Sequence, residues 1–296
     1  MRLIFIDLDA LNIEERKNIA KNVKMSKEAL TLLANDFSEE VLIALAENIA
    51  ASKEVLADLA GRKSVRIQWR VAENISASEE TLDKLSRSEK IFIKSSVSEN
   101  PSTSKHTLDR LANDSNANIR FATANNQSTA DYTLARLSKD EEIKVRIAVA
   151  SNSHTPKDAL KNLSNDENLN VVLAVAGNVN ASEETLDYLA DSLDNEVRLG
   201  VAQNKKANTK TLAKLSSDKY SCVRKAVAKN EATSQGTLDE LAKDKIVGVR
   251  VEVAKNINTR RKTLFVLKKD SDEAVATSAR DNLVLKYLVW QPNYPK

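Results

Sequence analysis

Residues 145–166 read VRIAVASNSHTPKDALKNLSND, and this pattern returns every 26 residues along most of the chain. Its clearest marker is an asparagine that recurs without a slip in spacing at eleven positions: Asn22, Asn48, Asn74, Asn100, Asn126, Asn152, Asn178, Asn204, Asn230, Asn256 and Asn282. In the first ten repeats a leucine stands eight residues after each asparagine, and a second leucine stands eleven residues after it. A fixed period between about twenty and fifty residues is the signature of a repeat solenoid.

Each repeat is predicted to form two short helices. Val145, Ala148, Val149 and Asn152 lie at i, i+3, i+4 and i+7, which indicates a first helix that ends near the asparagine. A serine four residues after the asparagine marks the start of a second helix, because its hydroxyl can accept a hydrogen bond from an unpaired backbone N–H. These serines are Ser26, Ser52, Ser78, Ser104, Ser182 and Ser234. The sequence therefore predicts an all-α solenoid of about eleven two-helix repeats, with the leucine columns facing inward.

The whole chain, residues 1–296, is predicted to be a single repeat domain. Residues 1–12 are expected to form an N-terminal cap, residues 13–290 hold the repeats anchored on Asn22 to Asn282, and residues 291–296 form an irregular tail. The last repeat loses the pattern, with Arg280 in a column of small residues, as is expected of a terminal repeat.

The pattern VR-x-x-VA-x-N followed by L-x-x-L-A-x-D, seen in VRIAVASNSHTPKDALKNLSND and VRKAVAKNEATSQGTLDELAKD, resembles the leucine-rich repeat variant, a HEAT-like helical repeat of bacterial proteins. The resemblance covers about residues 13 to 290. It implies a right-handed superhelix in which an α-helix alternates with a second short helix that can be partly 3₁₀. Some members carry a cysteine-rich iron–sulfur segment, but this chain has one cysteine, so we expect no cofactor.

Composition excludes several other classes of protein. The single cysteine, Cys222, cannot form an intramolecular disulfide, and no Cys or His cluster has metal-ligand spacing, so we predict a cytoplasmic protein without a metal. No apolar stretch approaches about eighteen residues, so no membrane span is predicted. His106 and His154 occupy different places in their repeats and lack an identifiable serine partner, so we predict that the chain is not an enzyme.

Two polar columns have both a structural and a functional interpretation. The asparagine column is expected to be structural, with each asparagine in a left-handed conformation bonding the turn and forming a ladder along the solenoid. The basic column six residues before it, which includes Arg146 and Arg198, is often preceded by an aspartate six residues earlier. HEAT-like repeats commonly use such pairs as a ladder between repeats, while ligand contact is the alternative. Arg198 has Ser192 at the aspartate position, which predicts that it is free for a partner.

An apolar column five residues before the asparagine is the most informative for function. Its members are Ile43, Trp69, Phe121, Ile147, Leu173, Leu199 and Val251. Either the first helix is buried on two sides, or these side chains line one face of the solenoid. On the second interpretation they form a protein-binding surface with Trp69 and Phe121 as anchors. The candidate partner-binding residues are Trp69, Phe121, Ile147, Leu173, Arg198 and Leu199.

Charge is distributed unevenly. Residues 205–270 contain 17 Lys and Arg against 7 Asp and Glu, a net charge of +10, so the rest of the chain carries −7 within a total of +3. This predicts a polarised surface. The candidate phosphate-binding residues are Lys205, Lys206, Lys225, Lys229, Arg260, Arg261 and Lys262.

From the sequence we expect a monomeric, non-enzymatic binding scaffold that recognises a protein or peptide on the curved face of the solenoid. The alternative is nucleic-acid binding through the basic C-terminal third, for which no base-reading motif or interleaved aromatic residues are present. A third hypothesis is self-association through the apolar segment from Leu3 to Ile6.

Overall fold

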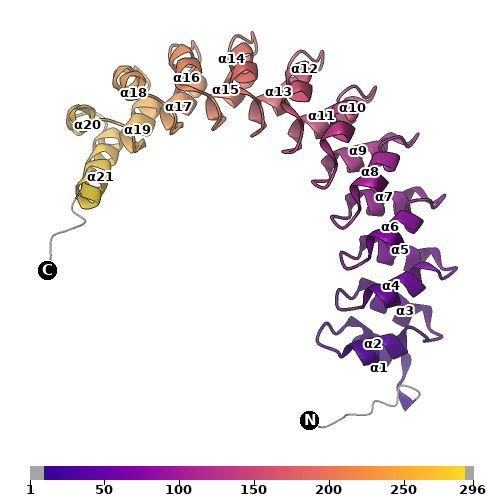
Figure 1. Ribbon diagram of the computed structural model, residues 1–296. Coiled ribbons are helices and arrows are strands. Elements are labelled where there is room, and N and C mark those ends of the chain that lie inside the picture. Colours follow the sequence, from indigo (N-terminus) through magenta and orange to yellow (C-terminus); the bar gives the residue numbers. More distant parts are fainter. Residues whose placement is uncertain (1–9, 291–296) are drawn as a thin grey trace. The chain divides into compact units, whose positions relative to one another are not determined.

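A computed structural model describes residues 10–290, and the secondary-structure elements assigned in that range are all α-helices. First and second helices alternate along the chain, as Figure 1 shows. The first helices have nine residues, whereas the second helices have seven, except for α4 with eight. The predicted all-α repeat fold is confirmed.

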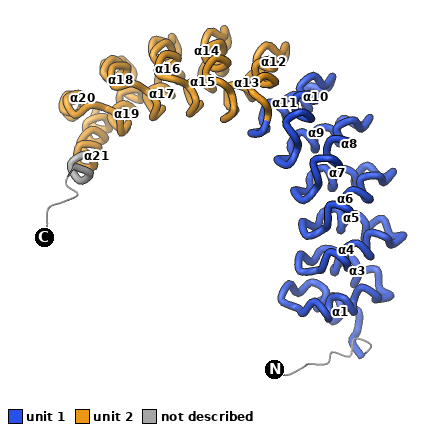
Figure 2. Tube along the Cα trace, viewed as in Figure 1, with its two compact units in different colours: residues 1–154 blue, residues 155–296 orange. Residues whose placement is uncertain are grey.

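The helices fall into two compact units, residues 1–154 and 155–296, coloured separately in Figure 2. In the first unit, the first helices are α1 (Ile13–Lys21), α3 (Glu39–Glu47), α5 (Val65–Glu73), α7 (Ile91–Glu99), α9 (Ala117–Asn125) and α11 (Ile143–Ser151). Its second helices are α2 (Lys27–Leu33), α4 (Lys53–Ala60), α6 (Glu79–Leu85), α8 (Lys105–Leu111) and α10 (Asp131–Leu137). A single domain over residues 1–296 stays a prediction.

The second unit repeats the arrangement. Its first helices are α13 (Leu169–Gly177), α15 (Asn195–Gln203), α17 (Ser221–Lys229) and α19 (Val247–Lys255). Its second helices are α12 (Lys157–Leu163), α14 (Glu183–Leu189), α16 (Thr209–Leu215), α18 (Gln235–Leu241) and α20 (Arg261–Leu267). The last helix, α21 (Glu273–Trp290), runs for 18 residues without a break, because the turn signals of the earlier repeats are missing there.

Capping residues set the ends of the short helices. Ser104 has an extended backbone, and its Oγ accepts from the N–H of Thr107 at 3.2 Å, which satisfies one orphan donor of α8. The serines that the sequence marked at the starts of α2, α4, α6, α14 and α18 act in the same way. The second helices are α-helical, so the 3₁₀ character implied by the family resemblance is not seen in these elements.

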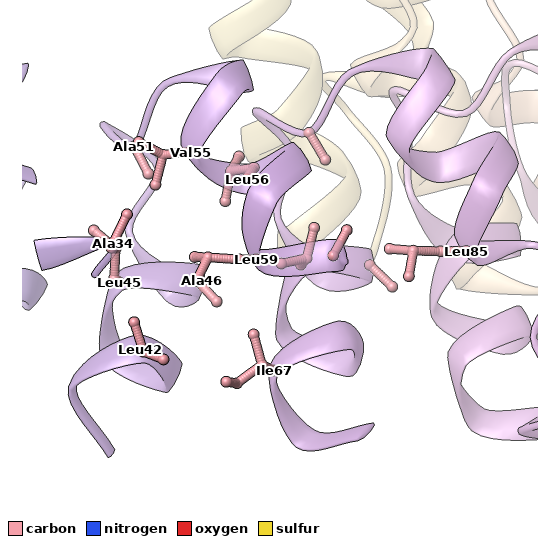
Figure 3. Close-up of a cluster of buried hydrophobic side chains, with 14 of the residues drawn as sticks. Ala34, Leu42, Leu45, Ala46, Ala51, Val55, Leu56, Leu59, Ile67 and Leu85 are labelled. Atoms are coloured by element: carbon pink, nitrogen blue, oxygen red, sulfur yellow. The ribbon is translucent and has the colours of Figure 1, made fainter. Parts of the chain in front are cut away.

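Leucine, valine and alanine from consecutive repeats form the core. In the first unit Leu45, Leu56 and Leu59 are completely buried and lie between neighbouring helices, as Figure 3 shows. Ile67 extends the same cluster into the next repeat. Each such side chain contributes roughly 1.5 to 3 kcal/mol when it leaves water. Because a lone helix pair buries few of these side chains, stacking of repeats supplies most of the stability.

The two predicted end segments lie mainly outside the described residues. This applies to residues 1–9, including the segment from Leu3 to Ile6, and to the tail at 291–296. The described part of the N-terminal cap ends at Asn12, whose side chain forms a capping box with Glu15 at the start of α1. In the last repeat Arg280 is exposed and donates a hydrogen bond to Glu273, so it does not enter the small-residue contacts of the other repeats.

Candidate binding surface

The asparagine column forms a ladder of hydrogen bonds that is buried at most of its positions. Asn126 Nδ2 donates to the carbonyl oxygens of Ser98 at 2.7 Å and Asn100 at 2.9 Å, both in the preceding repeat. Its Oδ1 accepts from the N–H of Ser128 at 2.8 Å. The structural interpretation is therefore confirmed. The expected left-handed conformation is wrong, since Asn126 has φ −68° and ψ 125°, and no described residue has a positive φ. The extended backbone aims the amide at the preceding repeat.

The basic column forms a second ladder. Arg224 donates from Nε and Nη2 to the carboxylate of Asp244 at 2.6 and 3.0 Å, and from Nη1 to the backbone oxygen of Asp218 at 2.8 Å. Other ion pairs of this kind are Arg16–Asp36, Lys94–Asp114, Arg120–Asp140, Arg198–Asp218 and Arg250–Asp270. In each pair the aspartate stands 20 residues after the basic residue. The ion pairs thus join neighbouring repeats.

Arg198 is not free for a partner, so that prediction is wrong. Its Nε donates to Asp218 at 2.5 Å, and its Nη1 donates to the backbone oxygen of Ser192 at 2.7 Å. The residue is only 9% exposed. Position 192 supplies a backbone carbonyl, which any residue type has, so the absence of an aspartate side chain there releases nothing.

These bonds change the acidity of the carboxyl groups. The hydrogen bond from Arg224 is the largest cause that lowers the pKa of Asp244 below its usual value, and it outweighs desolvation by burial, which raises the pKa. The pKa of Asp270 is lowered by the hydrogen bond from Arg250 in the same way. Both aspartates are therefore ionised near neutral pH, and the ladder is a row of charged pairs.

The apolar column is half-buried along both units, and we call it the apolar row. Ile43, Trp69, Ile147, Leu173, Leu199 and Val251 are intermediate in exposure, and Phe121 is 38% exposed. Neither sequence interpretation is complete, because each side chain packs partly against its neighbours and leaves the rest on the surface. The row therefore offers apolar contact area without any side chain standing clear of the fold.

Trp69 is held by its surroundings. Its Nε1 donates to Ser96 Oγ at 3.0 Å, and its ring meets the ring of Phe92 edge to face with centroids 5.8 Å apart. The guanidinium of Arg70 lies 4.2 Å from the centre of the ring. Trp69 therefore links α5 to α7 as well as exposing part of its indole.

A groove of about 730 Å³ lies on the first helices of the second unit, between α15, α17 and α19. Its lining residues from α17 are Cys222, Lys225, Ala226 and Lys229, and their spacing of i, i+3, i+4 and i+7 puts them on one side of that helix. From α15 and the turn that follows it come Leu199, Ala202, Gln203 and Lys205. Glu231 and Glu252 add two carboxylates, and Asn230 and Ala232 complete the lining. A volume of this size suits a small ligand or a few side chains of a peptide.

The structure divides the candidate phosphate-binding residues. Three of them, Lys205, Lys225 and Lys229, line the groove, while Lys206 is exposed on the same turn as Lys205 but is not among the lining residues. The other three candidates, Arg260, Arg261 and Lys262, lie at the start of the second helix α20. There Arg260 pairs with Asp239 at 2.7 Å, and Lys262 Nζ lies 3.7 Å from the same carboxylate.

Of the partner-binding candidates, only Leu199 lines the groove, and the sequence did not predict the groove itself. Two features of the sequence could have indicated the groove. Lys225 and Lys229 are four residues apart on one helix, and small residues stand at positions 202 and 226. Within residues 10–290 there is no cluster of three or more His, Cys, Asp or Glu placed to hold a metal ion. No described helix is long and apolar enough to span a membrane.

Comparison with known proteins supports the fold. A solved structure described as a leucine-rich repeat variant with a novel repetitive protein structural motif is 20% identical to this chain, covering 75% of it and 87% of that chain, with a TM-score of 0.53. The chain thus has the helical-repeat fold of a leucine-rich repeat variant. No family model and no curated protein matches the sequence.

Two further structures are more distant. The structure of Kap95p bound to RanGDP is 10% identical, covers 93% of this chain and 55% of that chain, and has a TM-score of 0.49. An engineered protein is 16% identical, covers 92% of this chain and 94% of that chain, and has a TM-score of 0.32. These likenesses are too remote to bear on function.

Proposed function

We propose that this protein is a non-enzymatic scaffold that binds a protein or peptide through the first helices of its second unit, with the groove as the central contact. The groove is the observation on which this proposal depends. It combines an apolar floor from Leu199 and Ala226 with exposed polar groups at its edges, which is the composition of a recognition site.

The two ladders support this assignment by elimination. The asparagine and arginine side chains form hydrogen bonds that join neighbouring repeats. Asn204 donates to backbone oxygens of the preceding repeat, and Arg224 donates to the carboxylate of Asp244 and the backbone oxygen of Asp218. The conspicuous conserved-looking columns of the repeat are therefore structural, and the residues left for recognition are those that vary from repeat to repeat. Variable side chains on a rigid repeated framework are how solenoids present an extended binding surface.

The single cysteine allows a direct test. Cys222 is exposed and lines the groove, so a thiol-reactive photo-crosslinker can be attached there without any substitution. The labelled full-length protein is irradiated in a lysate of the source cells, and captured proteins are identified by mass spectrometry. The matched control moves the thiol to the second-helix layer by combining Cys222→Ser with Ala213→Cys, since Ala213 is exposed on α16.

We expect a discrete protein to be captured from position 222 and not from position 213. The substitution Leu199→Glu, which puts a charge on the apolar floor, should abolish the capture. Circular dichroism of this variant serves as the control for folding. Capture of the same proteins from both positions, or of none from position 222, would contradict the proposal.

A further inference from the structure

Three lysines of the groove have no ion-pair partner among the described residues. Within the part of the chain that the structure describes, Lys205, Lys225 and Lys229 take part in no ion pair and no side-chain hydrogen bond. All three are exposed. Elsewhere in the same unit lysines do find partners, as Lys214 does with Asp191. The groove therefore presents positive charge that nothing in the second unit neutralises by direct contact.

The fold does not require lysine at these positions. The site of Lys229, immediately before the ladder asparagine, is held by Glu47, Glu73 and Glu99 in the first unit. All of these residues are exposed helix ends, so either charge is compatible with the repeat. Likewise Lys225 occupies a place in the apolar row that other repeats fill with residues such as Leu199. In the first repeat Lys17 and Lys21 hold the same two places, but there Lys17 pairs with Glu14 at 2.8 Å. The groove is therefore distinguished by a lysine pair that has no ion-pair partner among the described residues.

The other lining residues distinguish a peptide from a nucleic acid. Glu231 and Glu252 would repel a continuous row of phosphates, and no aromatic side chain lines the groove to stack on a base. A peptide can match the mixture, since it carries single carboxylates spaced by apolar side chains. The amide of Gln203, which is exposed and makes no side-chain hydrogen bond among the described residues, is available for a peptide backbone.

We propose that the ligand of the groove is an extended acidic peptide, whose carboxylates meet Lys225 and Lys229 while an apolar side chain on the same face of the peptide rests on Leu199 and Ala226. This assignment rests on the proposed function and specifies the chemistry of its partner. Spacing supports it, because Lys225 and Lys229 are one helical turn apart, about 6 Å, which is close to the rise of two residues in an extended chain. Alternate residues of the peptide therefore reach the two ammonium groups.

The test uses the full chain and short fluorescent peptides of defined sequence. The probe has serine at every second position, with two glutamates followed by a leucine at the positions between. Three competitors are compared with it: the same peptide with lysine in place of glutamate, the same peptide with serine in place of leucine, and a single-stranded oligodeoxythymidine. Fluorescence anisotropy is measured at low and moderate salt. The acidic leucine peptide should bind tightest, with an affinity that falls as salt rises.

The double variant Lys225→Glu, Lys229→Glu should weaken binding of the acidic peptide at least about tenfold, because it replaces two attractions with two repulsions. The matched control reverses two exposed lysines of the same unit outside the groove, Lys157→Glu and Lys269→Glu, and should leave the affinity within about twofold. The double variant should also bind the lysine peptide better than the unmodified protein does, which loss of folding cannot produce.

Three results would overturn the inference: equal binding of the acidic and basic peptides, equal loss of affinity in both double variants, or binding of oligodeoxythymidine in preference to every peptide. The first two remove the assignment of charge to the groove, and the third assigns the lysines to phosphates. Groove-specific capture by the photo-crosslinker at Cys222 without binding of the acidic peptide would overturn this inference and leave the scaffold proposal standing.

Discussion

Replacing Asn126 by alanine tests whether the asparagine ladder stabilises the solenoid. Asn126 is 6% exposed, and its side chain makes three hydrogen bonds, two to carbonyl oxygens of the preceding repeat and one from the N–H of Ser128. Alanine removes all three and leaves the oxygens of Ser98 and Asn100 without this donor in a buried place.

At about 1 kcal/mol for each hydrogen bond, with more where a buried group is left unsatisfied, Asn126→Ala should lower the free energy of unfolding by about 3 to 4 kcal/mol. Asn125→Ala is the matched control, because Asn125 is the exposed neighbour on the same helix and donates or accepts no side-chain hydrogen bond in the described structure. Its effect should stay within about 0.5 kcal/mol.

Urea denaturation near neutral pH, followed by circular dichroism, measures both differences. Hydrogen exchange of the Ser128 amide reports the local effect, and exchange should accelerate in Asn126→Ala because that N–H loses its acceptor. Asn126→Asp is the sharper variant, since it keeps the shape but turns a donor into an oxygen facing two carbonyl oxygens, and it should be at least as destabilising as alanine. A loss below about 1 kcal/mol for alanine, or a tolerated aspartate, would refute the ladder as a source of stability.

The remaining predictions concern charge and aromatic contacts. Burial raises the pKa of Asp83, but hydrogen bonds led by that from Arg110 prevail and lower it to about 2, so the ionised form stabilises the fold above the unfolded value near 3.9. The contribution of Asp83 to the free energy of unfolding should thus be constant above about pH 5 and be lost between about pH 4 and 2. After solvent screening this contribution is roughly 1 to 2 kcal/mol. Urea denaturation at several pH values should show a shallower fall for Asp83→Asn. Arg198→Ala should cost about 3 kcal/mol in the same assay and Arg198→Lys less, whereas a neutral result for alanine would mean that the ladder pair adds nothing. Trp69→Phe and Ser96→Ala should each cost about 1 kcal/mol, and a double-mutant cycle that shows no coupling would contradict their hydrogen bond.

The period and the helix pattern were predictable because they depend on local rules. Spacing of apolar residues, serine caps and the position of asparagine each act within a few residues, and the structure places the helices where these signals indicate. The conformation of the asparagines was not predictable in this way. A left-handed residue and an extended residue both end a helix, and the choice depends on the carbonyl groups of the preceding repeat, which the local sequence does not specify.

The arginine ladder shows a limit that is peculiar to repeats. Asp218 stands six residues before Arg224 and also 20 residues after Arg198, so in a 26-residue period the two spacings describe the same column. The sequence therefore identified the partner column but not which copy supplies the carboxylate. The distances between the side chains show which arginine binds the carboxylate of Asp218. The carboxylate accepts from Arg198, and the backbone oxygen of Asp218 accepts from Arg224. The prediction of a free Arg198 failed for this reason.

The groove was beyond the sequence for a different physical cause. A groove depends on how far apart neighbouring helices stand and on which side chains fill the space between them. The lining of this groove comes from α15, α17 and α19, which are separated by at least one helix each in the sequence. Composition showed an excess of lysine in the region, but not that Lys205 and Lys225 border one depression while Arg260 is occupied by Asp239.

The hydrogen bonds from the asparagine amides to the preceding repeat allow one copy of the repeat to be exchanged for another. The donor in one copy meets backbone carbonyls 26 and 28 residues earlier, and backbone carbonyls are the same whatever side chains a copy carries. A gene that duplicates or deletes one whole copy inside either unit would rejoin a donor to equivalent acceptors, whereas a change of any other length would leave the amide facing the wrong atoms. Selection can therefore vary the length of the array and the surface residues of each copy independently, as long as changes in length come in steps of 26.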